Sequence, residues 1–121
     1  MTQVLVVDDS AIIRKIARRI LEDLRFETSE AEDGARALDR CAATMPDAIF
    51  LDWNMPVMDG YEFLRELRKM PDGARPKVVF CTTENDVAQI ARAMHAGADE
   101  YIMKPFDRHI VQSKMEEIGL A

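Results

Sequence analysis

Five polar side chains that could take part in chemistry each follow a short apolar run of the sequence. Each run has the length and composition of a buried β-strand. Because the carboxyl ends of parallel strands meet at one edge of a sheet, we expect these side chains to converge in one cleft. The set comprises Asp8 and Asp9 after Val4–Val7, Asp52 after Ala48–Leu51, Thr82 after Lys77–Cys81, and Lys104 after Glu100–Met103.

The charges of these groups do not balance. Three carboxylates and one ammonium group leave two negative charges, and like charges about 4 Å apart repel by roughly 4 kcal/mol at an effective dielectric constant near 20. A divalent cation would cancel the excess, and oxygen ligands favour Mg²⁺ over zinc. A carboxylate is also a feasible nucleophile toward phosphorus. We therefore predict that Asp52 accepts a phosphoryl group, whose oxygens are stabilised by Mg²⁺, Lys104 and the Thr82 hydroxyl.

The elements that must position these groups alternate along the chain. We expect strands over 4–7, 26–31, 47–51, 77–81 and 100–103. Helical patterns occupy a segment from Ser10, as its N-cap, to Leu24, and then 35–44, 61–70, 85–96 and 107–118. Strands that alternate with helices predict parallel pairing through right-handed crossovers. The expected fold class is therefore α/β, with a doubly wound five-stranded parallel sheet.

The first predicted helix has an apolar stripe and a basic face. The stripe predicted to face the core consists of Ile12, Ile13, Ile16, Ala17, Ile20, Leu21 and Leu24. The basic face consists of Arg14, Lys15, Arg18 and Arg19. This face is either simply solvated or docks against an acidic protein partner, and the sequence leaves both possibilities open.

Composition narrows the class of protein. A chain of 121 residues with 48% hydrophobic residues fits a single soluble domain over residues 1–121, without an output domain. The net charge of −6 argues against nucleic acid as a direct partner. The apolar stretch near the N-terminus is far too short for a signal peptide or a membrane span, so we expect a cytoplasmic protein with no membrane partner. Cys41 and Cys81 are predicted to be small buried hydrophobic residues.

Motifs at the predicted strand ends carry a family resemblance. They read Val-Val-Asp-Asp-Ser at 6–10 and Leu-Asp-Trp-Asn-Met-Pro-Val-Met-Asp-Gly at 51–60, followed by Thr82 and by Lys-Pro-Phe at 104–106. With these motifs the chain resembles response-regulator receiver domains over essentially its whole length, and single-domain CheY-like regulators in particular. The resemblance implies the sheet order 2-1-3-4-5 of the flavodoxin- and CheY-like (βα)₅ fold.

The resemblance also implies how the cleft would work. Asp52 would take its phosphoryl group from the phosphohistidine of a sensor histidine kinase or a histidine phosphotransfer protein. The implied Mg²⁺ ligands are Asp9, Asp52 and the backbone carbonyl of Asn54, with Asp8 acting through water. Lys104 would contact the phosphate, and its peptide bond to Pro105 would be cis.

Further positions would carry or tune the signal. Thr82 and Tyr101 would form a switch pair, in which the aromatic ring fills the space left when the hydroxyl moves inward. Asn54 and Glu84 occupy the positions that tune self-dephosphorylation in the family. Thr83 stands where the family often has a smaller residue, which would narrow access to the phosphoryl group.

Three functions are compatible with these residues. The first is a two-component response regulator, in chemotaxis or related bacterial signalling, whose fourth helix, fifth strand and fifth helix bind an effector protein. The second is a phosphate sink or relay intermediate with no effector of its own. In both, a monomer would catalyse only its own phosphorylation and dephosphorylation, so we do not expect an enzyme. The third and remote one is a Mg²⁺-dependent aspartyl-phosphate phosphohydrolase, for which Asp8 and Asp9 lack the required D-x-D spacing.

Overall fold

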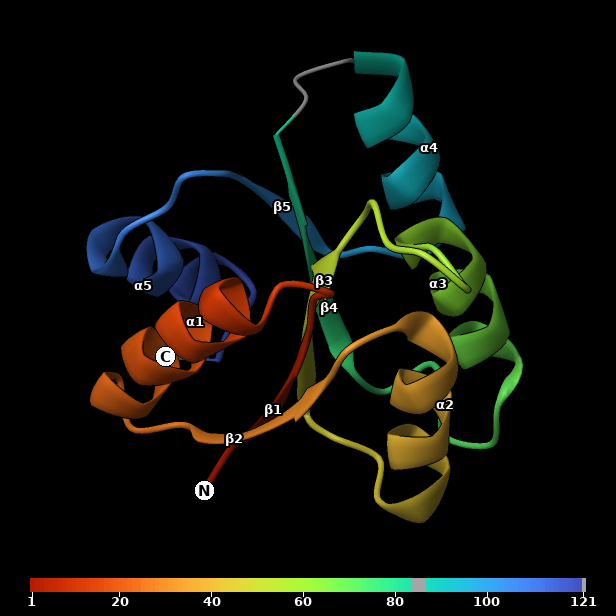
Figure 1. The fold of residues 1–121 in the computed structure, drawn as a ribbon, viewed down its shortest axis with the longest axis horizontal. Helices are drawn as coiled ribbons and strands as arrows, with labels where there is room; N and C mark the ends of the chain where they lie inside the picture. The colour runs from red at the N-terminus through yellow and green to blue at the C-terminus, as the bar shows by residue number, and fades with distance from the viewer. Residues whose placement is uncertain (84–86, 121) are drawn as a thin grey trace.

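A computed structural model, which describes residues 1–83 and 87–120, contains one parallel sheet of five strands in the order β2-β1-β3-β4-β5 (Figure 1). The strands are β1 Gln3–Val7, β2 Glu27–Ala31, β3 Ala48–Asp52, β4 Lys77–Thr82 and β5 Glu100–Met103. The helices are α1 Ala11–Asp23, α2 Gly34–Ala43, α3 Gly60–Lys69, α4 Val87–Ala96 and α5 Arg108–Glu117. The predicted α/β fold class and the strand order are both confirmed.

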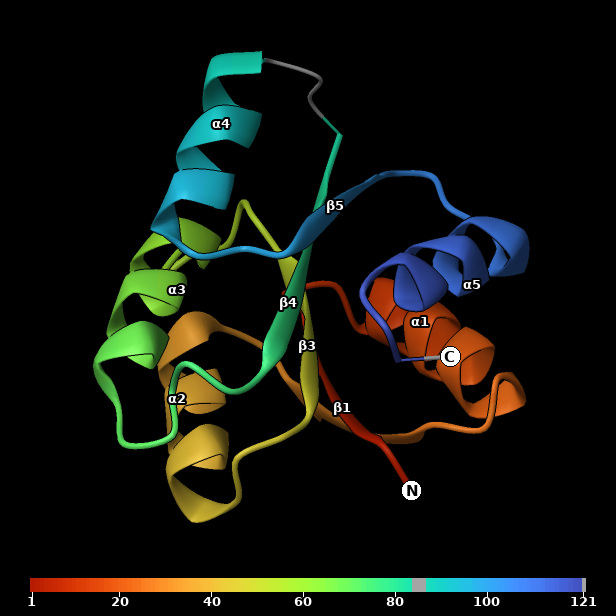
Figure 2. The same cartoon turned by 180° about the vertical axis from the view of Figure 1, so that it is seen from behind.

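Helices cover both faces of the sheet. α1 and α5 lie on one face, and α2, α3 and α4 lie on the other (Figures 1 and 2). Each face has its own apolar core. The core beneath α2, α3 and α4 includes Phe63 and Leu64, whereas Leu21 and Met115 belong to the core beneath α1 and α5. Full burial of one such side chain contributes about 1.5–3 kcal/mol to folding, so the sheet is a rigid support for whatever lies at its edge.

Burial along the strands follows their place in the sheet. All five residues of the central strand β3 are buried, as expected for a strand covered on both faces. The edge strand β2 instead alternates between exposed and half-buried residues up to the buried Ala31. The continuous apolar run therefore delivers Asp52 to the middle of the sheet edge, while β2 leaves polar side chains beside α1.

Four helices begin at a side chain that caps them. Ser10, Asp33, Asp59 and Asp107 each accept a hydrogen bond from a backbone N–H three residues later. Such a cap contributes about 1 kcal/mol. The Asp59 cap starts α3 close against the loop after β3, where a Cβ atom on Gly60 would lie only 2.7 Å from the carbonyl oxygen of Asp52. A larger residue at Gly60 would displace the backbone of Asp52.

The structure corrects two sequence expectations. Ile12 and Ile16 do not face the core, since 72% and 44% of their surface is exposed. They lie one turn apart on a flank of α1 that neither the sheet nor α5 covers, while Ala17 and Leu21 make the buried contact. Thr82 was expected after its strand, but it is the last residue of β4, paired with Met103.

The other predicted boundaries lie within one residue of the observed ones wherever the structure describes them, and the strand predicted over 100–103 has the same bounds as β5. The first two residues of the predicted fourth helix, 85 and 86, lie outside the described part of the chain. Among the described residues, no helix is long and apolar enough to cross a membrane.

Candidate functional site

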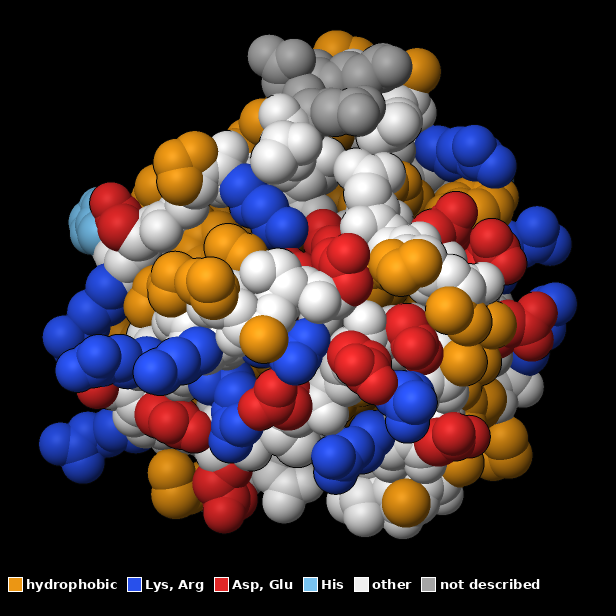
Figure 3. Space-filling model, viewed as in Figure 1, with side chains coloured by type: hydrophobic (Ala, Val, Ile, Leu, Met, Phe, Trp, Pro, Cys, Tyr) orange, Lys and Arg blue, Asp and Glu red, His pale blue; other side chains and the backbone are white. Residues whose placement is uncertain are grey.

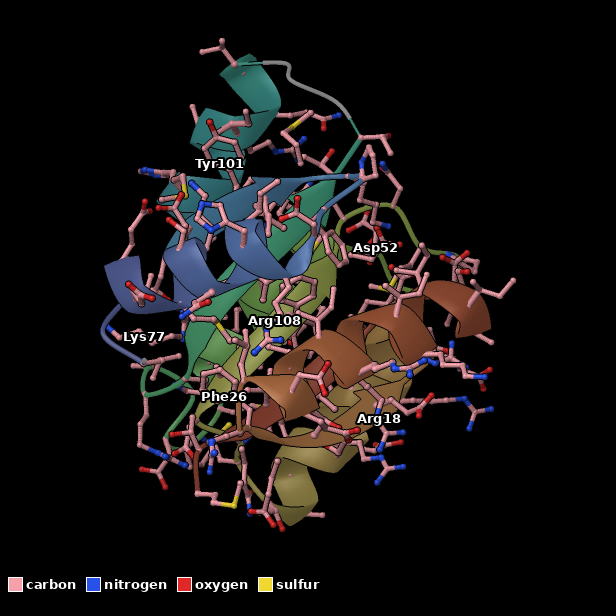
Figure 4. All side chains as sticks on the ribbon, turned by 90° about the vertical axis from the view of Figure 1, so that its left-hand side faces the viewer. Arg18, Phe26, Asp52, Lys77, Tyr101 and Arg108 are labelled. Atoms are coloured by element: carbon pink, nitrogen blue, oxygen red, sulfur yellow. The ribbon has the colours of Figure 1, made fainter. Side chains whose placement is uncertain are left out.

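The carboxylates of Asp8, Asp9 and Asp52 meet at the carboxyl edge of the sheet. One oxygen from each lies within 4.8 Å of the others. Asp52 ends β3, and the other two follow β1. Asp8 and Asp52 are only 4% and 5% exposed, whereas Asp9 faces solvent. Figure 4 shows Asp52 at the end of the sheet, above α1. The cleft is therefore closed around two carboxylates and open at the third.

Lys104 directly follows β5, the outermost strand of the sheet, and its side chain extends to this cluster. Its Nζ atom donates to Oδ2 of Asp8 and to Oδ1 of Asp52, both at 3.0 Å. Its backbone N–H donates to the carbonyl of Thr82 at 2.9 Å, and its peptide bond to Pro105 is cis. Burial alone would lower the pKa of Lys104, but the hydrogen bonds that it donates to Asp52 and Asp8 outweigh burial and raise that pKa. The ammonium group stays charged between its two acceptors.

The pKa of Asp52 is raised to about 6. Burial is the largest cause, and the negative charges of Asp8 and Asp9 act in the same direction. The hydrogen bond from Lys104 opposes them. At neutral pH the carboxyl group is still mostly ionised, but its ionisation is costly, and an added cation would relieve that cost.

The donor set fits a hard divalent cation. Three carboxylate oxygens converge, and Asp9 leaves a solvent-facing side where water can complete an octahedron, as Mg²⁺ requires. Neither cysteine offers a ligand here, since both are buried in the cores. Asn54 lies two residues beyond Asp52 on the same loop, with an exposed side chain; the role of its carbonyl as a metal ligand stays a prediction.

Thr82 and Tyr101 lie on neighbouring strands. Thr82 is 2% exposed at the end of β4, and Tyr101 is half-buried on β5, where it pairs with Phe80. The rings of Phe80 and Tyr101 are 5.9 Å apart, and Lys114 of α5 lies 5.1 Å from the centre of the Tyr101 ring. Figure 4 shows Tyr101 well away from Asp52, toward α4. Thr83 is exposed beside the cleft, and Glu84 lies outside the described residues.

The sequence did not reveal two contacts that hold Asp8. The backbone N–H of Ser10 donates to Oδ1 of Asp8 at 2.9 Å, and Nη1 of Arg14 donates to its backbone carbonyl at 2.8 Å. The first contact is a short-range turn that an Asp-x-Ser sequence could have suggested. The second depends on how α1 crosses the sheet, which no local pattern encodes.

Comparison with known proteins agrees with this geometry. Residues 4–116 match the family model described as the response regulator receiver domain. The chain is 37% identical to the chemotaxis protein CheY of Pseudomonas aeruginosa over 96% of this chain and 94% of that protein. It is 35% identical to the chemotaxis protein CheY of Halobacterium salinarum, over 96% and 95%.

Solved structures show the same fold. The chemotaxis protein CheY4 of Vibrio cholerae superposes with a TM-score of 0.93 at 31% identity, over 98% of both chains. The receiver domain of a sensor histidine kinase from Pseudomonas aeruginosa, described with a magnesium ion coordinated in its active-site cleft, has a TM-score of 0.88 at 27% identity, over 96% of this chain and 95% of that one. The family match, the sheet order and the acidic cleft lead to one conclusion: this chain belongs to the response regulator receiver domain family.

Proposed function

We propose that this protein is a response regulator of two-component signalling that accepts a phosphoryl group on Asp52. The observation that carries the proposal is the buried Asp52 carboxylate, hydrogen-bonded to Lys104 and crowded by two further carboxylates. The donor would be a phosphohistidine of a sensor histidine kinase or a histidine phosphotransfer protein. The relatives named as chemotaxis proteins favour chemotaxis or a related bacterial process.

The residues of the cleft divide the chemistry between them. An Asp52 oxygen attacks phosphorus, an O–P bond forms, and the P–N bond to the donor imidazole breaks, with its electron pair and a proton ending on the imidazole nitrogen. Asp9, Asp52 and the Asn54 carbonyl would hold Mg²⁺, with Asp8 acting through water, and the bound ion would supply positive charge beside the transferred group. Lys104 moves its hydrogen bond from Asp52 to a phosphoryl oxygen. The excess negative charge of the cleft would thus select a cation and fix it beside the acceptor.

The signal would leave the cleft along β4 and β5. The new phosphoryl oxygens need a hydrogen-bond donor, and the Thr82 hydroxyl at the end of β4 is suited to this role. Its movement would make room for the Tyr101 ring, which now lies between Phe80 and Lys114. The surface formed by α4, β5 and α5 would then bind an effector protein.

The lifetime of the phosphoryl group would depend on the rim of the cleft. The side chains of Asn54 and Thr83 are exposed, and their proposed role is to assist or obstruct an attacking water. Glu84 has the same proposed role, but it lies outside the described residues. In this scheme the receiver domain acts on its own phosphoryl group only, as a monomer.

A phosphate sink or relay intermediate is the second candidate. It is favoured by the likeness to receiver domains of histidine kinases. Beryllofluoride-activated and resting protein would separate the two candidates in a binding assay with the signalling proteins of the same cell. A response regulator has an effector that binds the activated form more tightly, whereas a sink has none.

Phosphorylation of Asp52 can be tested directly. The protein is incubated with phosphoramidate and Mg²⁺, and the phosphorylated residue is mapped by mass spectrometry after borohydride trapping of the acyl phosphate. We expect one phosphoryl group on Asp52, no label in Asp52→Asn, and normal labelling in Asp39→Asn, which changes an exposed carboxylate of α2. Label that persists in Asp52→Asn would overturn the assignment.

A further inference from the structure

Arg14 connects the acidic cleft to the edge strand of the sheet. Its guanidinium group donates from Nη1 to the carbonyl oxygen of Asp8 at 2.8 Å and from Nε to Oε1 of Glu30 at 2.7 Å. Glu30 lies on β2, and only 15% of the Arg14 side chain is exposed. The Arg14 guanidinium group therefore links the turn that carries Asp8 and Asp9 to the neighbouring strand β2.

This contact continues the pairing of β1 with β2 beyond the last paired residues, Val7 and Ala31. The backbone N–H of Asp8 still donates to the carbonyl of Ala31, at 3.2 Å. Its carbonyl has no strand partner opposite it, and Arg14 satisfies it instead, anchored to Glu30. Both backbone polar groups of Asp8 are thus fixed to β2, one directly and one through a guanidinium group.

Glu30 is a firm anchor for this bridge. Its carboxylate also pairs with Arg18, and the hydrogen bond from Arg14, against a smaller opposing effect of burial, holds its pKa below the usual value. Arg18 donates in addition to the hydroxyl of Thr28 at 3.0 Å. Charged at neutral pH and fixed by two arginines, Glu30 holds the Arg14 guanidinium in one orientation.

The side chain of Asp8 is held as firmly as its backbone. Oδ1 accepts from the Ser10 N–H and Oδ2 accepts from Lys104. The direction of the Asp8–Asp9 turn therefore depends on its backbone, because the turn must present both carboxylates toward Asp52. The guanidinium charge beside the Asp8 carbonyl also limits the repulsion between the carboxylates.

We infer that Arg14 is a positioning residue for the cleft, which sets its affinity for a divalent cation by holding the Asp8–Asp9 turn against β2. The inference rests on the proposed function, since it assigns the cation site to the same carboxylates. The inference also separates Arg14 from the other basic residues on this face of α1. Figure 3 shows basic side chains gathered over α1 with acidic ones between them; Lys15 and Arg19 are exposed there, but Arg14 turns inward to the site.

Arg18 provides a matched control. It is on the same helix and pairs with the same carboxylate, yet its described contacts are with Glu22, Thr28 and Glu30, and none of them reaches Asp8. Figure 4 shows Arg18 on α1 far from Asp52. Arg14→Met and Arg18→Met each remove one ion pair with Glu30, but only the first releases the Asp8 carbonyl.

The test is a Mg²⁺ titration read by the fluorescence of Trp53, the sole tryptophan, which is buried next to Asp52. Residues that orient metal ligands typically change metal affinity by about 10- to 100-fold, so we expect Arg14→Met to weaken Mg²⁺ binding by about 10-fold. Arg14→Lys should recover part of the loss, because it keeps the charge but replaces the two donor nitrogen atoms of the guanidinium fork by a single nitrogen. Arg18→Met should stay within about twofold of wild type, since it leaves the contact to Asp8 in place.

Equal Mg²⁺ affinities in Arg14→Met and Arg18→Met would overturn the inference, as would no weakening in either. If Arg14→Met does not fold, Glu30→Gln tests the same bridge by weakening its anchor, and it should reduce the affinity by about threefold, less than loss of the contact itself. Unchanged affinity in Glu30→Gln would then count against the bridge. Phosphoramidate labelling of wild type is scored separately: if Asp52 is not labelled while the Mg²⁺ affinities differ as expected, the proposed function fails and the positioning role stands.

Discussion

Two charge clusters adjoin at Asp8, and their charge balances differ. In the cleft, three carboxylates surround one ammonium group, that of Lys104. Beside it, two guanidinium groups, those of Arg14 and Arg18, surround one carboxylate, Glu30. The pKa values differ accordingly: that of Asp52 is raised to about 6, mainly by burial, whereas that of Glu30 is lowered, mainly by its hydrogen bond to Arg14.

The difference shows which cluster is complete. Glu30 and Glu22 together balance the charges of Arg14 and Arg18, so the β2 cluster is neutral by itself and serves as a support. The cleft is short of positive charge at a buried position, where water compensates poorly. Folding leaves two negative charges in the cleft without a positive partner, which is typical of a cation-binding site. One divalent cation would balance them.

The largest expected effect comes from removing the ammonium group of Lys104 from the cleft. Lys104→Met keeps the aliphatic stem but leaves Asp8 and Asp52 without their ammonium partner. We expect the metal-free protein to lose about 3 kcal/mol of unfolding free energy near pH 8, as for other buried ion pairs broken on one side. Urea denaturation measures this loss. A variant as stable as wild type would mean that the carboxylates do not depend on Lys104.

Removing the Asp52 carboxylate, which accepts a hydrogen bond from Lys104, should instead increase the unfolding free energy. The folded-state pKa of Asp52, about 6, lies above the ordinary value of 3.8. Its contribution to stability is therefore fully present below about pH 4 and is lost as the pH rises through about 6, a loss of about 3 kcal/mol. Asp52→Asn avoids the loss but gives up the bond to Lys104, so we expect a net gain of about 2 kcal/mol near pH 8 and none near pH 4.

Urea denaturation of metal-free protein at both pH values provides the measurement. Asp39→Asn, on the surface of α2, removes the same charge without entering the cleft and should change stability little at either pH. A destabilised Asp52→Asn near pH 8 would show that the cleft is not short of positive charge.

The β2 cluster should respond to pH in the other direction. Because the pKa of Glu30 is lowered in the folded protein, its contribution is present above the ordinary value of 4.5 and is lost as the pH falls through the lower folded value. Glu30→Gln should cost about 1 kcal/mol near pH 7, a modest figure because the side chain is 35% exposed. The cost should be smaller at an acidic pH below the folded-state pKa than near pH 7, which urea denaturation at the two pH values would show. An equal cost at both pH values would show that the charge of Glu30 does not account for the stabilisation.

The smallest expected effect, at an exposed surface ion pair, is a reference for the larger ones. Glu32 and Arg36 form an ion pair at 2.7 Å on the surface of α2, with both side chains more than half exposed. Glu32→Gln should change the unfolding free energy by less than about 0.5 kcal/mol. A thermal denaturation series with and without salt would measure it. A change as large as that for Glu30→Gln would mean that the bridge to Arg14 adds nothing to an ordinary surface pair.

The sequence predicted the α/β fold class and the convergence of the cleft because both follow from periodicity, whereas the strand order followed from the family resemblance. Apolar runs identified the strands, and parallel strands place Asp8, Asp52 and Lys104 at one edge whatever the details of packing. Other features depend on how helices cross the sheet. The exposure of Ile12 reflects a helix whose buried face is narrower than its apolar stripe, and the bridge from Arg14 needs the spacing between α1 and β2.

The most direct test of the account is the pKa of Asp52, measured by carbon NMR of its carboxyl group with and without Mg²⁺. The cleft is short of positive charge, so the carboxyl should titrate at about 6 in the metal-free protein. Saturating Mg²⁺ should move the titration well below that value, because the cation favours the charged form. A carboxyl group that titrates near 3.8 without the metal, or that does not respond to it, would contradict the central claim that the charge deficit around Asp52 is what binds the cation.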